Sequence, residues 1–244
     1  MYLFSHRLVL ALAAAFLALC LALPAPALAQ AYQCRAPQGR ISLPPITREG
    51  PVRDTPITGY TLAVSWSPEF CRGREDDPQH VRQCSGRGGR FGFVVHGLWP
   101  EGRGGEWPQW CEATRQPSEQ AVRETLCIMP GERMIAHEWA RHGSCMVRNP
   151  DAYLRVTRIL WSGLRWPEYD RLSRNRTLTA GEIRQAFADA NGRWEPEHVG
   201  LVVNERGWLT ELRLCYGRDF LPAPCDRRRF GPADDVEVRI WRGL

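Results

Sequence analysis

The sequence predicts an α+β fold in which a central, mostly antiparallel sheet is flanked by helices and stabilised by disulfides. Segments of strand and helix character are mixed along the chain, without the regular alternation that is typical of a doubly wound parallel sheet. Eight of the nine cysteines follow an apolar N-terminal run. An even number of cysteines in an exported chain indicates disulfides rather than metal ligands.

The N-terminus has the composition of a secretory signal. A basic Arg7 precedes an apolar run over residues 8–23, and the small-x-small sequence of residues 27–29 follows it. We therefore expect residues 1–29 to be a cleaved signal peptide and residues 30–244 to form a single domain. Two prolines interrupt the sequence after the run, so we expect no membrane anchor once the signal is removed.

The mature chain is expected to be mildly basic. The formal net charge is +5, and removal of a signal with one Arg and no acidic residue lowers it to +4. This charge favours an anionic partner without identifying one. All 32 basic side chains are Arg, which suits bidentate phosphate contacts, although a GC-rich genome also explains the composition. The Arg-only composition and the signal indicate a bacterial protein with a periplasmic or secreted location.

The first part of the mature chain contains two predicted strands. Residues 30–56 are rich in Pro, Gly and Arg, which predicts an extended arm. Residues 60–66 are a predicted strand because they are rich in β-branched and aromatic side chains. Residues 72–90 are polar and Gly-rich and predict a loop, whereas residues 91–95 are short and apolar enough to be a central strand.

Helices are predicted in the middle of the chain. Residues 118–126 and 151–161 have helical character. Residues 131–142 form a better-defined helix, with Pro130 as its start signal and Gly143 as its stop signal.

The last third of the chain begins with a helix and turns to strands. Residues 179–182, Thr-Ala-Gly-Glu, match a capping box in front of an apolar helical stripe. Strands are predicted over residues 199–203, 208–216 and 236–241.

Two short segments contain the candidate catalytic residues. One is the sequence HGLWP at residues 96–100, and the other is HEWARHGSC at residues 137–145. On an ideal α-helix, Glu138, Arg141 and His142 share one face because they lie at i, i+3 and i+4. The two histidines of this segment would lie about 140° apart. Because a zinc site of the HExxH type needs two histidines four residues apart, we expect no metal.

These residue types suit proton transfer around a phosphodiester. His96 is expected at the end of the predicted strand at residues 91–95, just before Gly97. If the sheet packs beside the helix, His96 and His142 can flank one reacting centre. Two imidazoles with ordinary pKa values of about 6.5 can act as base and acid, which predicts a bell-shaped pH profile. Arg141 can neutralise charge on phosphate oxygens, and Glu138 can orient a histidine or bind a phosphate oxygen when protonated. The plainer alternatives are a structural histidine at 96 and a surface ion pair between Glu138 and Arg141.

Both segments resemble the two active-site segments of the ribonuclease T2 family. Residues 62–68 with Cys71, residues 179–183 and residues 212–215 also resemble that family. The resemblance spans about Tyr60 to Cys225. It implies a ribonuclease T2-like catalytic domain that cleaves single-stranded RNA without metal or cofactor, through a 2′,3′-cyclic phosphate to 3′-phosphate ends.

The resemblance also implies a role for each catalytic residue. His142 would take the proton of the ribose 2′-OH, His96 would protonate the leaving 5′-oxygen, and His137 would hold the phosphate. Glu138 and Arg141 would stabilise the pentacovalent phosphorane. The family usually has Lys at the position of Arg141, so the contact made by the larger guanidinium is open.

Three tryptophans are candidates for base stacking. The family places the tryptophan of HGLWP near a base site, so we expect Trp99 to bind the substrate by stacking. For Trp107 and Trp110, in a Gly-rich loop, a base pocket and structural packing are equal alternatives.

The short loops make Cys71–Cys84 and Cys215–Cys225 the natural local disulfides. The resemblance implies Cys111–Cys145 beside the active site, which leaves Cys34–Cys127 as the remaining pair.

We therefore expect an exported, monomeric endoribonuclease that acts on single-stranded RNA and does not cleave DNA, because DNA lacks the 2′-OH. One alternative is a catalytically silent family member that binds RNA or a protein, and another is a metallohydrolase. Base preference and the physiological RNA are left open by the sequence.

Overall fold

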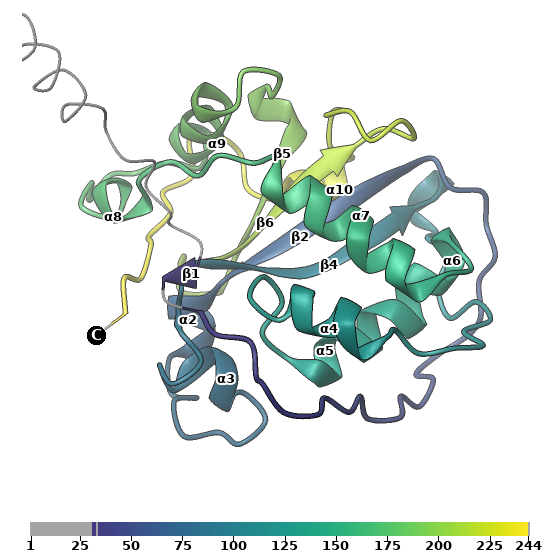
Figure 1. Ribbon diagram of the computed structural model, residues 1–244. Coiled ribbons are helices and arrows are strands. Elements are labelled where there is room, and N and C mark those ends of the chain that lie inside the picture. Colours follow the sequence, from purple (N-terminus) through teal and green to yellow (C-terminus); the bar gives the residue numbers. More distant parts are fainter. Residues whose placement is uncertain (1–30, 33, 244) are drawn as a thin grey trace, which may run out of the picture.

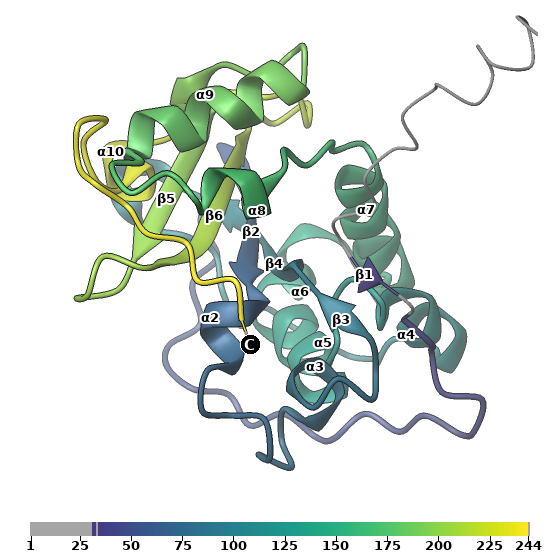
Figure 2. The same cartoon turned by 90° about the vertical axis from the view of Figure 1, so that its left-hand side faces the viewer.

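The computed structural model describes residues 31–32 and 34–243. The expected signal peptide at residues 1–29 therefore lies outside the described residues. Figure 1 shows a central sheet with helices on both sides, and Figure 2 shows the same arrangement turned by 90°. The expected α+β class is confirmed, since the main sheet is antiparallel throughout and four disulfides are present.

The main sheet has four strands in the order β4-β2-β6-β5. These are β2 (Gly59–Trp66), β4 (Phe93–Glu101), β5 (Val199–Val203) and β6 (Leu209–Tyr216). A separate pair joins β1 (Ala31–Tyr32) to β3 (Arg90–Phe91). The inner strand β2 has a neighbour on each side, and its central residues Leu62, Ala63 and Val64 are fully buried.

Two groups of helices cover the sheet. Helices α4 (Glu119–Thr125), α5 (Glu132–Glu138) and α7 (Pro150–Ser162) lie on the side of β4, whereas α8 (Tyr169–Leu172) and α9 (Ala180–Ala190) lie on the side of β5 and β6 (Figures 1 and 2). The predicted capping box of α9 is present, with both of its hydrogen bonds. The shorter elements are α2 (Ser67–Cys71), α3 (Val81–Cys84), η1 (Arg103–Gly105), α6 (Ser144–Met146), η3 (Pro196–His198) and α10 (Arg227–Phe230).

The helix that contains HEWARHGSC does not end where the sequence predicts. A π-helical turn, η2 (Trp139–Gly143), follows α5, and α6 continues the helical stretch to Met146. Gly143 is therefore not the stop signal. A Cβ at this glycine would lie only 2.6 Å from Cγ of Tyr153 and 2.7 Å from Cε3 of Trp139. Glycine is needed there because α7 packs closely against the turn, not because the helix ends.

Two strand predictions are also wrong in part. Of the strand expected at residues 91–95, Phe91 belongs to β3 and residues 93–95 begin the longer β4, which lies at an edge of the main sheet rather than in its centre. A loop supplies the missing neighbour at one point, where the N–H of Val95 donates to the carbonyl of Ile128 at 2.7 Å. Residues 236–241 form no strand and contribute only the isolated bridges Thr179–Glu237 and Trp208–Arg239. The loop expected at residues 72–90 contains α3 and the first residue of β3.

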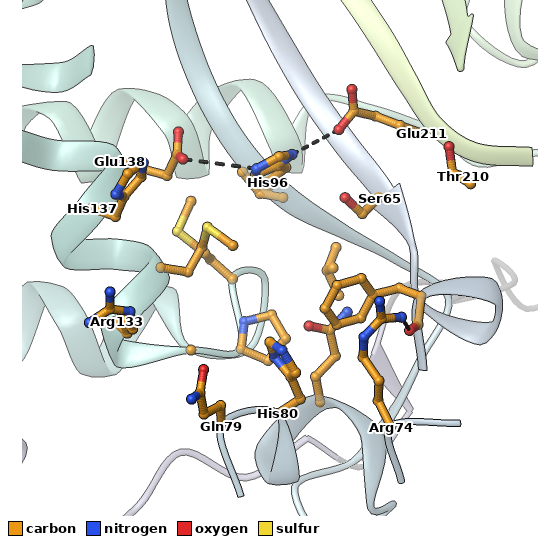
Figure 3. Close-up of a pocket in the computed structure, with 18 of the residues that line it drawn as sticks. Ser65, Arg74, Gln79, His80, His96, Arg133, His137, Glu138, Thr210 and Glu211 are labelled. Atoms are coloured by element: carbon orange, nitrogen blue, oxygen red, sulfur yellow. Dashed lines mark hydrogen bonds and ion pairs between the residues drawn. The ribbon is translucent and has the colours of Figure 1, made fainter. Parts of the chain in front are cut away.

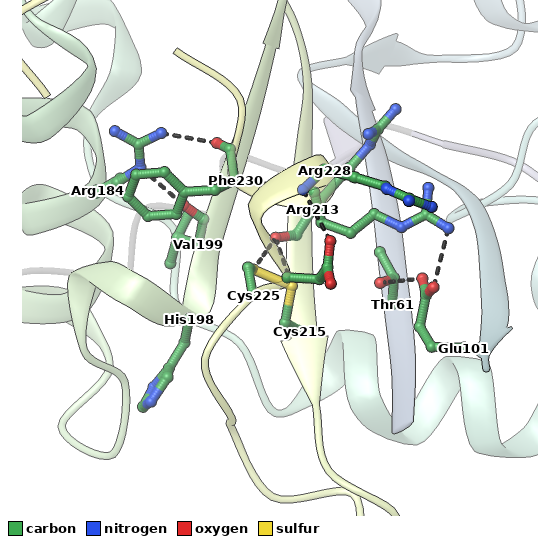
Figure 4. The surroundings of a disulfide bond; sticks show 12 residues. Thr61, Glu101, Arg184, His198, Val199, Arg213, Cys215, Cys225, Arg228 and Phe230 are labelled. Atoms are coloured by element: carbon green, nitrogen blue, oxygen red, sulfur yellow. Dashed lines mark hydrogen bonds and ion pairs between the residues drawn. A yellow bond between two sulfur atoms is a disulfide. The ribbon is translucent and has the colours of Figure 1, made fainter. Parts of the chain in front are cut away.

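The four disulfides join the same cysteine pairs that the sequence analysis names. They are Cys34–Cys127, Cys71–Cys84, Cys111–Cys145 and Cys215–Cys225. Figure 4 shows the surroundings of the last pair. Nearby, the fully buried Arg184 of α9 donates to the carbonyl of Phe230 at 2.7 Å and thereby attaches the C-terminal segment to the helix. In the part of the chain that the structure describes, no helix is long and apolar enough to cross a membrane.

Candidate active site

All the candidate catalytic residues line one cavity of about 1590 Å³. Figure 3 shows His96 between Glu138 of the helix and Glu211 of β6, with His80 and Arg74 at the other end of the cavity. The sequence candidates that line it are His96, Trp99, Trp107, His137, Glu138, Arg141 and His142, whereas Trp110 is not among the lining residues. The structure thus brings the strand-borne and helix-borne histidines to one space.

His96 lies in a β-bulge in the middle of β4, not at the end of a strand. Gly97 pairs with Ala63 of β2, and Val95 pairs with Val64, so His96 is the extra residue without a partner. A bulge bends the strand locally and redirects the extra side chain. This irregularity explains how a residue within a sheet strand presents its imidazole to the cavity.

Gly97 and Trp99 set the position of Glu138. The Nε1–H of Trp99 donates a hydrogen bond of 2.8 Å to Oε2 of Glu138. A Cβ at Gly97 would overlap this same carboxylate oxygen. The glycine of HGLWP is therefore required for the close approach of a carboxylate to the strand.

Trp99 is close to both candidate acid–base residues. Its ring centroid is 5.1 Å from that of His96 and 5.7 Å from that of His142. The guanidinium carbon of Arg229 lies 5.9 Å from its ring centroid. The indole therefore packs near both imidazoles and also hydrogen-bonds Glu138, contacts that the stacking expected from the sequence does not include.

The pKa values of the two imidazoles move in opposite directions. Burial, together with the positive charge of Arg141, lowers the pKa of His142 from 6.5 to about 2; its Nδ1 atom is buried without a hydrogen-bond partner. Burial also opposes the charged form of His96, but the hydrogen bond to Glu211 and the charges of Glu138 and Glu211 outweigh it and raise its pKa. His142 is thus neutral and His96 favours the protonated form.

Glu138 is a buried carboxyl next to His96. It is 2% exposed, and its Oε1 lies 4.0 Å from Nε2 of His96. Burial raises the pKa of Glu138, although the charge of His96 and the hydrogen bond from Trp99 oppose this shift. Among the described residues it forms no ion pair with Arg141, so the surface ion pair considered in the sequence analysis is not present.

His137 and Arg141 are held by the loop before the first cysteine of the Cys111–Cys145 disulfide. The ring of Trp110 meets that of His137 edge-on at 5.4 Å, and the backbone N–H of Trp110 donates to the carbonyl of Arg141 at 2.8 Å. Nη2 of Arg141 donates to Oε1 of Gln109 at 3.4 Å, whereas its Nε is buried without a partner. Trp110 therefore packs against the site, and part of the Arg141 guanidinium is left to bind an anion.

The ideal α-helix is a poor description of this segment. It places His137 and His142 about 140° apart, yet both line the cavity. A π turn closes its hydrogen bonds five residues back instead of four, as the bond from the N–H of Ser144 to the carbonyl of Trp139 does. Residues five apart therefore come closer to one face. Within residues 31–32 and 34–243, no group of three or more His, Cys, Asp or Glu side chains has an arrangement that could hold a metal ion.

Glu211 is a further residue of the site that was not predicted from the sequence. Its Oε2 lies 2.8 Å from Nδ1 of His96, and Nε of Arg213 donates to its other oxygen at 3.1 Å. Glu211 is 8% exposed in a strand whose other residues are mostly apolar. A glutamate within a mostly apolar predicted strand could have indicated this residue from the sequence, because a buried charge needs a partner.

Comparison with known proteins identifies the family. The family model described as the ribonuclease T2 family matches residues 58–193. A probable ribonuclease of Haemophilus influenzae is 29% identical over 185 residues, which cover 71% of this chain and 62% of that protein. Ribonuclease I of Escherichia coli is 26% identical over 214 residues, which cover 71% of this chain and 80% of that protein. The match therefore spans less than two thirds of the length of the first relative.

Solved structures have the same fold. Trichomaglin, described as an S-like ribonuclease, superposes with a TM-score of 0.60 at 20% identity and covers 76% of this chain and 98% of its own. RNase NT in complex with 5′-AMP gives a TM-score of 0.53 at 19% identity, with 76% and 99% covered. At these identities the likeness concerns the fold alone. Because the family model covers more than half of the sequence, the chain belongs to the ribonuclease T2 family.

Proposed function

We propose that the protein is an exported endoribonuclease that cleaves single-stranded RNA by transphosphorylation, without a metal. The observation that carries this proposal is the pair His96 and His142, which line one cavity and have pKa values shifted in opposite directions. Acid–base catalysis needs one neutral and one protonated group at the same pH. Two titratable groups meet this need when their surroundings move their pKa values apart.

In the first step, neutral His142 takes the proton of the ribose 2′-OH. The 2′-oxygen forms a bond to phosphorus while the bond from phosphorus to the 5′-oxygen breaks. Protonated His96 gives its proton to that 5′-oxygen, and a 2′,3′-cyclic phosphate results. In the second step, water replaces the 5′-OH, the two imidazoles exchange functions, and a 3′-phosphate is released.

The other three catalytic candidates stabilise the charge of the phosphorane. Arg141 binds the non-bridging oxygens through the N–H groups that the protein leaves unpaired. His137 adds a further donor to the phosphate. Glu138, whose pKa is raised by burial, donates a hydrogen bond to a phosphate oxygen in its protonated form. Trp99 stacks on a base of the substrate.

Export is supported by the four disulfides, since disulfides persist in oxidising compartments. We propose a periplasmic or secreted enzyme that acts as a monomer and needs no cofactor. A ribose 2′-OH is the nucleophile, so DNA is not a substrate. The silent RNA- or protein-binding alternative is disfavoured by the presence of both imidazoles in one cavity.

The test is incubation of the purified protein with a mixed-sequence single-stranded RNA and the matching DNA, in excess chelator. We expect RNA fragments with cyclic phosphate and later 3′-phosphate ends, and intact DNA. RNA binding without cleavage would support the silent alternative, and cleavage that returns only with added metal would support a metallohydrolase.

Histidine variants provide the controls. His96→Ala and His142→Ala should each lower turnover by about 10²–10⁴-fold, the usual contribution of one general acid or base. His198→Ala is the matched control, because His198 lies outside the cavity and accepts a hydrogen bond from the N–H of Glu195. Near-full activity in either cavity variant would contradict the acid–base assignment.

A further inference from the structure

We propose that Glu211 is a positioning residue for His96, a function that rests on the proposed ribonuclease activity. Its carboxylate would hold Nδ1 of the imidazole so that Nε2 faces the leaving 5′-oxygen. Glu211 lies in β6, outside both histidine motifs. It does not contact the reacting atoms in this scheme, so it acts only through His96.

The sheet explains how a carboxylate of β6 reaches a histidine of β4. The strand β2 lies between them, and its Ser65 pairs with Glu211 on one side. Ser65, Glu211 and His96 all line the cavity and therefore project on the same face of the sheet (Figure 3). The small side chain of Ser65 leaves room for the carboxylate to cross β2. The bulge at His96 turns the imidazole towards it.

The hydrogen bond determines which nitrogen is free. Nδ1 of His96 lies 2.8 Å from Oε2 of Glu211, a normal distance for a charge-assisted hydrogen bond. A carboxylate only accepts, so Nδ1 keeps its proton in both charge states of the ring. The proton that His96 exchanges is therefore the one on Nε2. A third group that orients an acid or base in this way is a recurrent feature of catalytic sites.

The charges around His96 come from three elements. Glu211 and Arg213 face it from β6, Glu138 from α5, and Arg141, His137 and His142 from the helical stretch around η2. The carboxylate of Glu211 favours the imidazolium, and so does that of Glu138 when it is ionised. Nε of Arg213, 3.1 Å from Oε1 of Glu211, compensates part of this negative charge. The hydrogen bonds from His96 and Arg213 keep Glu211 ionised by lowering its pKa against the effect of burial.

A purely structural ion pair is the competing explanation. In that case removal of the Glu211 charge would lower the stability of the protein and would affect all substrates alike. A positioning residue for the general acid predicts something different. Removal of the Glu211 carboxylate would lower the rate only for substrates whose leaving oxygen needs a proton.

The experiment compares Glu211→Gln with the wild type on two substrates. The first is a dinucleoside phosphate such as UpA, whose 5′-oxygen must be protonated. The second is uridine 3′-(4-nitrophenyl phosphate), whose leaving group departs without a proton. We expect kcat on UpA to fall by about tenfold to a hundredfold, a part of the roughly 10²–10⁴-fold that one acid contributes. On the aryl ester we expect kcat to change by less than about threefold, because its leaving group needs no proton from His96.

The alkaline limb of the UpA profile gives a second readout. Without the carboxylate charge, His96 should lose its proton at lower pH, so the limb should move to lower pH in Glu211→Gln. Glu124→Gln is the matched control, since Glu124 is ion-paired with Arg158 outside the cavity. Equal losses on both substrates, or an unmoved alkaline limb, would overturn the proposal.

An NMR titration of His96 in Glu211→Gln and Glu211→Asp separates the two proposals. The ¹⁵N shifts of the wild-type imidazole should report a proton on Nδ1 in the neutral ring. Glu211→Asp, which keeps the charge, covers the case in which the Gln variant does not fold. If the wild type cleaves no RNA, the proposed function fails, whereas the tautomer and titration of His96 still decide whether Glu211 positions it. A neutral ring protonated on Nε2 would contradict the positioning function.

Discussion

At the scale of the residue, the two imidazoles differ because their neighbours differ. His142 follows the cation Arg141 in sequence and is buried without a partner for Nδ1. His96 instead faces the carboxylates of Glu138 and Glu211. The sequence predicted both histidines, since each lies in a recognisable motif. It could not predict their difference in pKa, because Glu211 lies 115 residues from His96 and is brought there only by the sheet.

The difference between the pKa values of His96 and His142 predicts a pH profile of activity with a broad plateau rather than a narrow bell. Because the pKa of His142 is lowered, this imidazole stays in its neutral, basic form throughout mildly acidic pH. Because the pKa of His96 is raised above 6.5, this imidazole stays mostly protonated to a higher pH than an ordinary histidine does. We expect kcat/KM on a dinucleoside phosphate to stay level from about pH 4.5 to about pH 6.5 and to fall on the alkaline side as His96 loses its proton.

The measurement is kcat/KM from about pH 4 to about pH 9, with the fold checked by circular dichroism at each end. The aryl ester described above serves as the control, because its alkaline limb should be absent. An acidic limb with its midpoint near 6.5 would mean that His142 titrates at its ordinary pKa, and would contradict the expectation.

At the scale of the element, two local irregularities place the catalytic side chains. One is the bulge at His96 in β4, and the other is the π turn η2 before α6. Local composition, capping and periodicity correctly predicted the existence of β2, β5, α7 and α9. A bulge and a π turn have no period of their own in the sequence, so the same reasoning placed His96 at a strand end and ended the helix at Gly143. These errors fall at the candidate site, where local rules are most often broken.

Gly143→Ala tests the packing of the π turn. A methyl group there would lie 2.6 Å from Tyr153 Cγ, so either the turn or α7 must shift. Tyr153 also donates a hydrogen bond from its hydroxyl to the carbonyl of Leu98 in β4 at 3.2 Å. We expect a loss of about 1–3 kcal/mol in the free energy of unfolding, which is typical of overpacking, together with reduced activity.

Thermal and denaturant unfolding measure this loss. For a chain of this size each kcal/mol lowers Tm by about 2–4 °C. Gly192→Ala is the matched control, because nothing lies within 4 Å of the added Cβ, and it should change stability by less than about 0.5 kcal/mol. If the two variants were equally stable, Gly143 would not be required by packing.

At the scale of the whole molecule, the fold class and the cysteine pairs were accessible from the sequence, whereas the sheet order was not. Alternating apolar segments indicate strands wherever they lie in the sheet, so β4 looked central although it is an edge strand. Its apolar sequence is explained by α5 and η2, which cover it together with the loop at Ile128. The order of strands in a sheet depends on contacts between segments that are distant in the sequence, and local sequence patterns do not predict such contacts.

The cavity extends well beyond the histidines and is lined by more arginines than carboxylates. The arginines are Arg72, Arg74, Arg82, Arg133, Arg141, Arg206, Arg213 and Arg229, and the carboxylates are Glu49, Glu69, Glu132, Glu138 and Glu211. Among the described residues, three of these arginines, Arg74, Arg133 and Arg141, form no ion pair. The volume and the excess positive charge suit several nucleotides on both sides of the cleaved bond.

This charge distribution predicts a salt dependence that grows with the length of the substrate. A long single strand releases counterions from every phosphate that an arginine neutralises, with a slope of about −0.7 in log affinity against log salt for each contact. A dinucleoside phosphate has one phosphate and should show a much weaker dependence. We expect Arg74→Gln to reduce the slope of kcat/KM for long RNA by about 0.7 and to leave the rate on UpA unchanged, because Arg74 is exposed and lies at the end of the cavity opposite His96 in Figure 3. Arg193→Gln, an exposed arginine outside the cavity, controls for net charge alone. If both variants lowered the slope equally, the RNA would respond to the charge of the whole molecule and not to a track along the cavity.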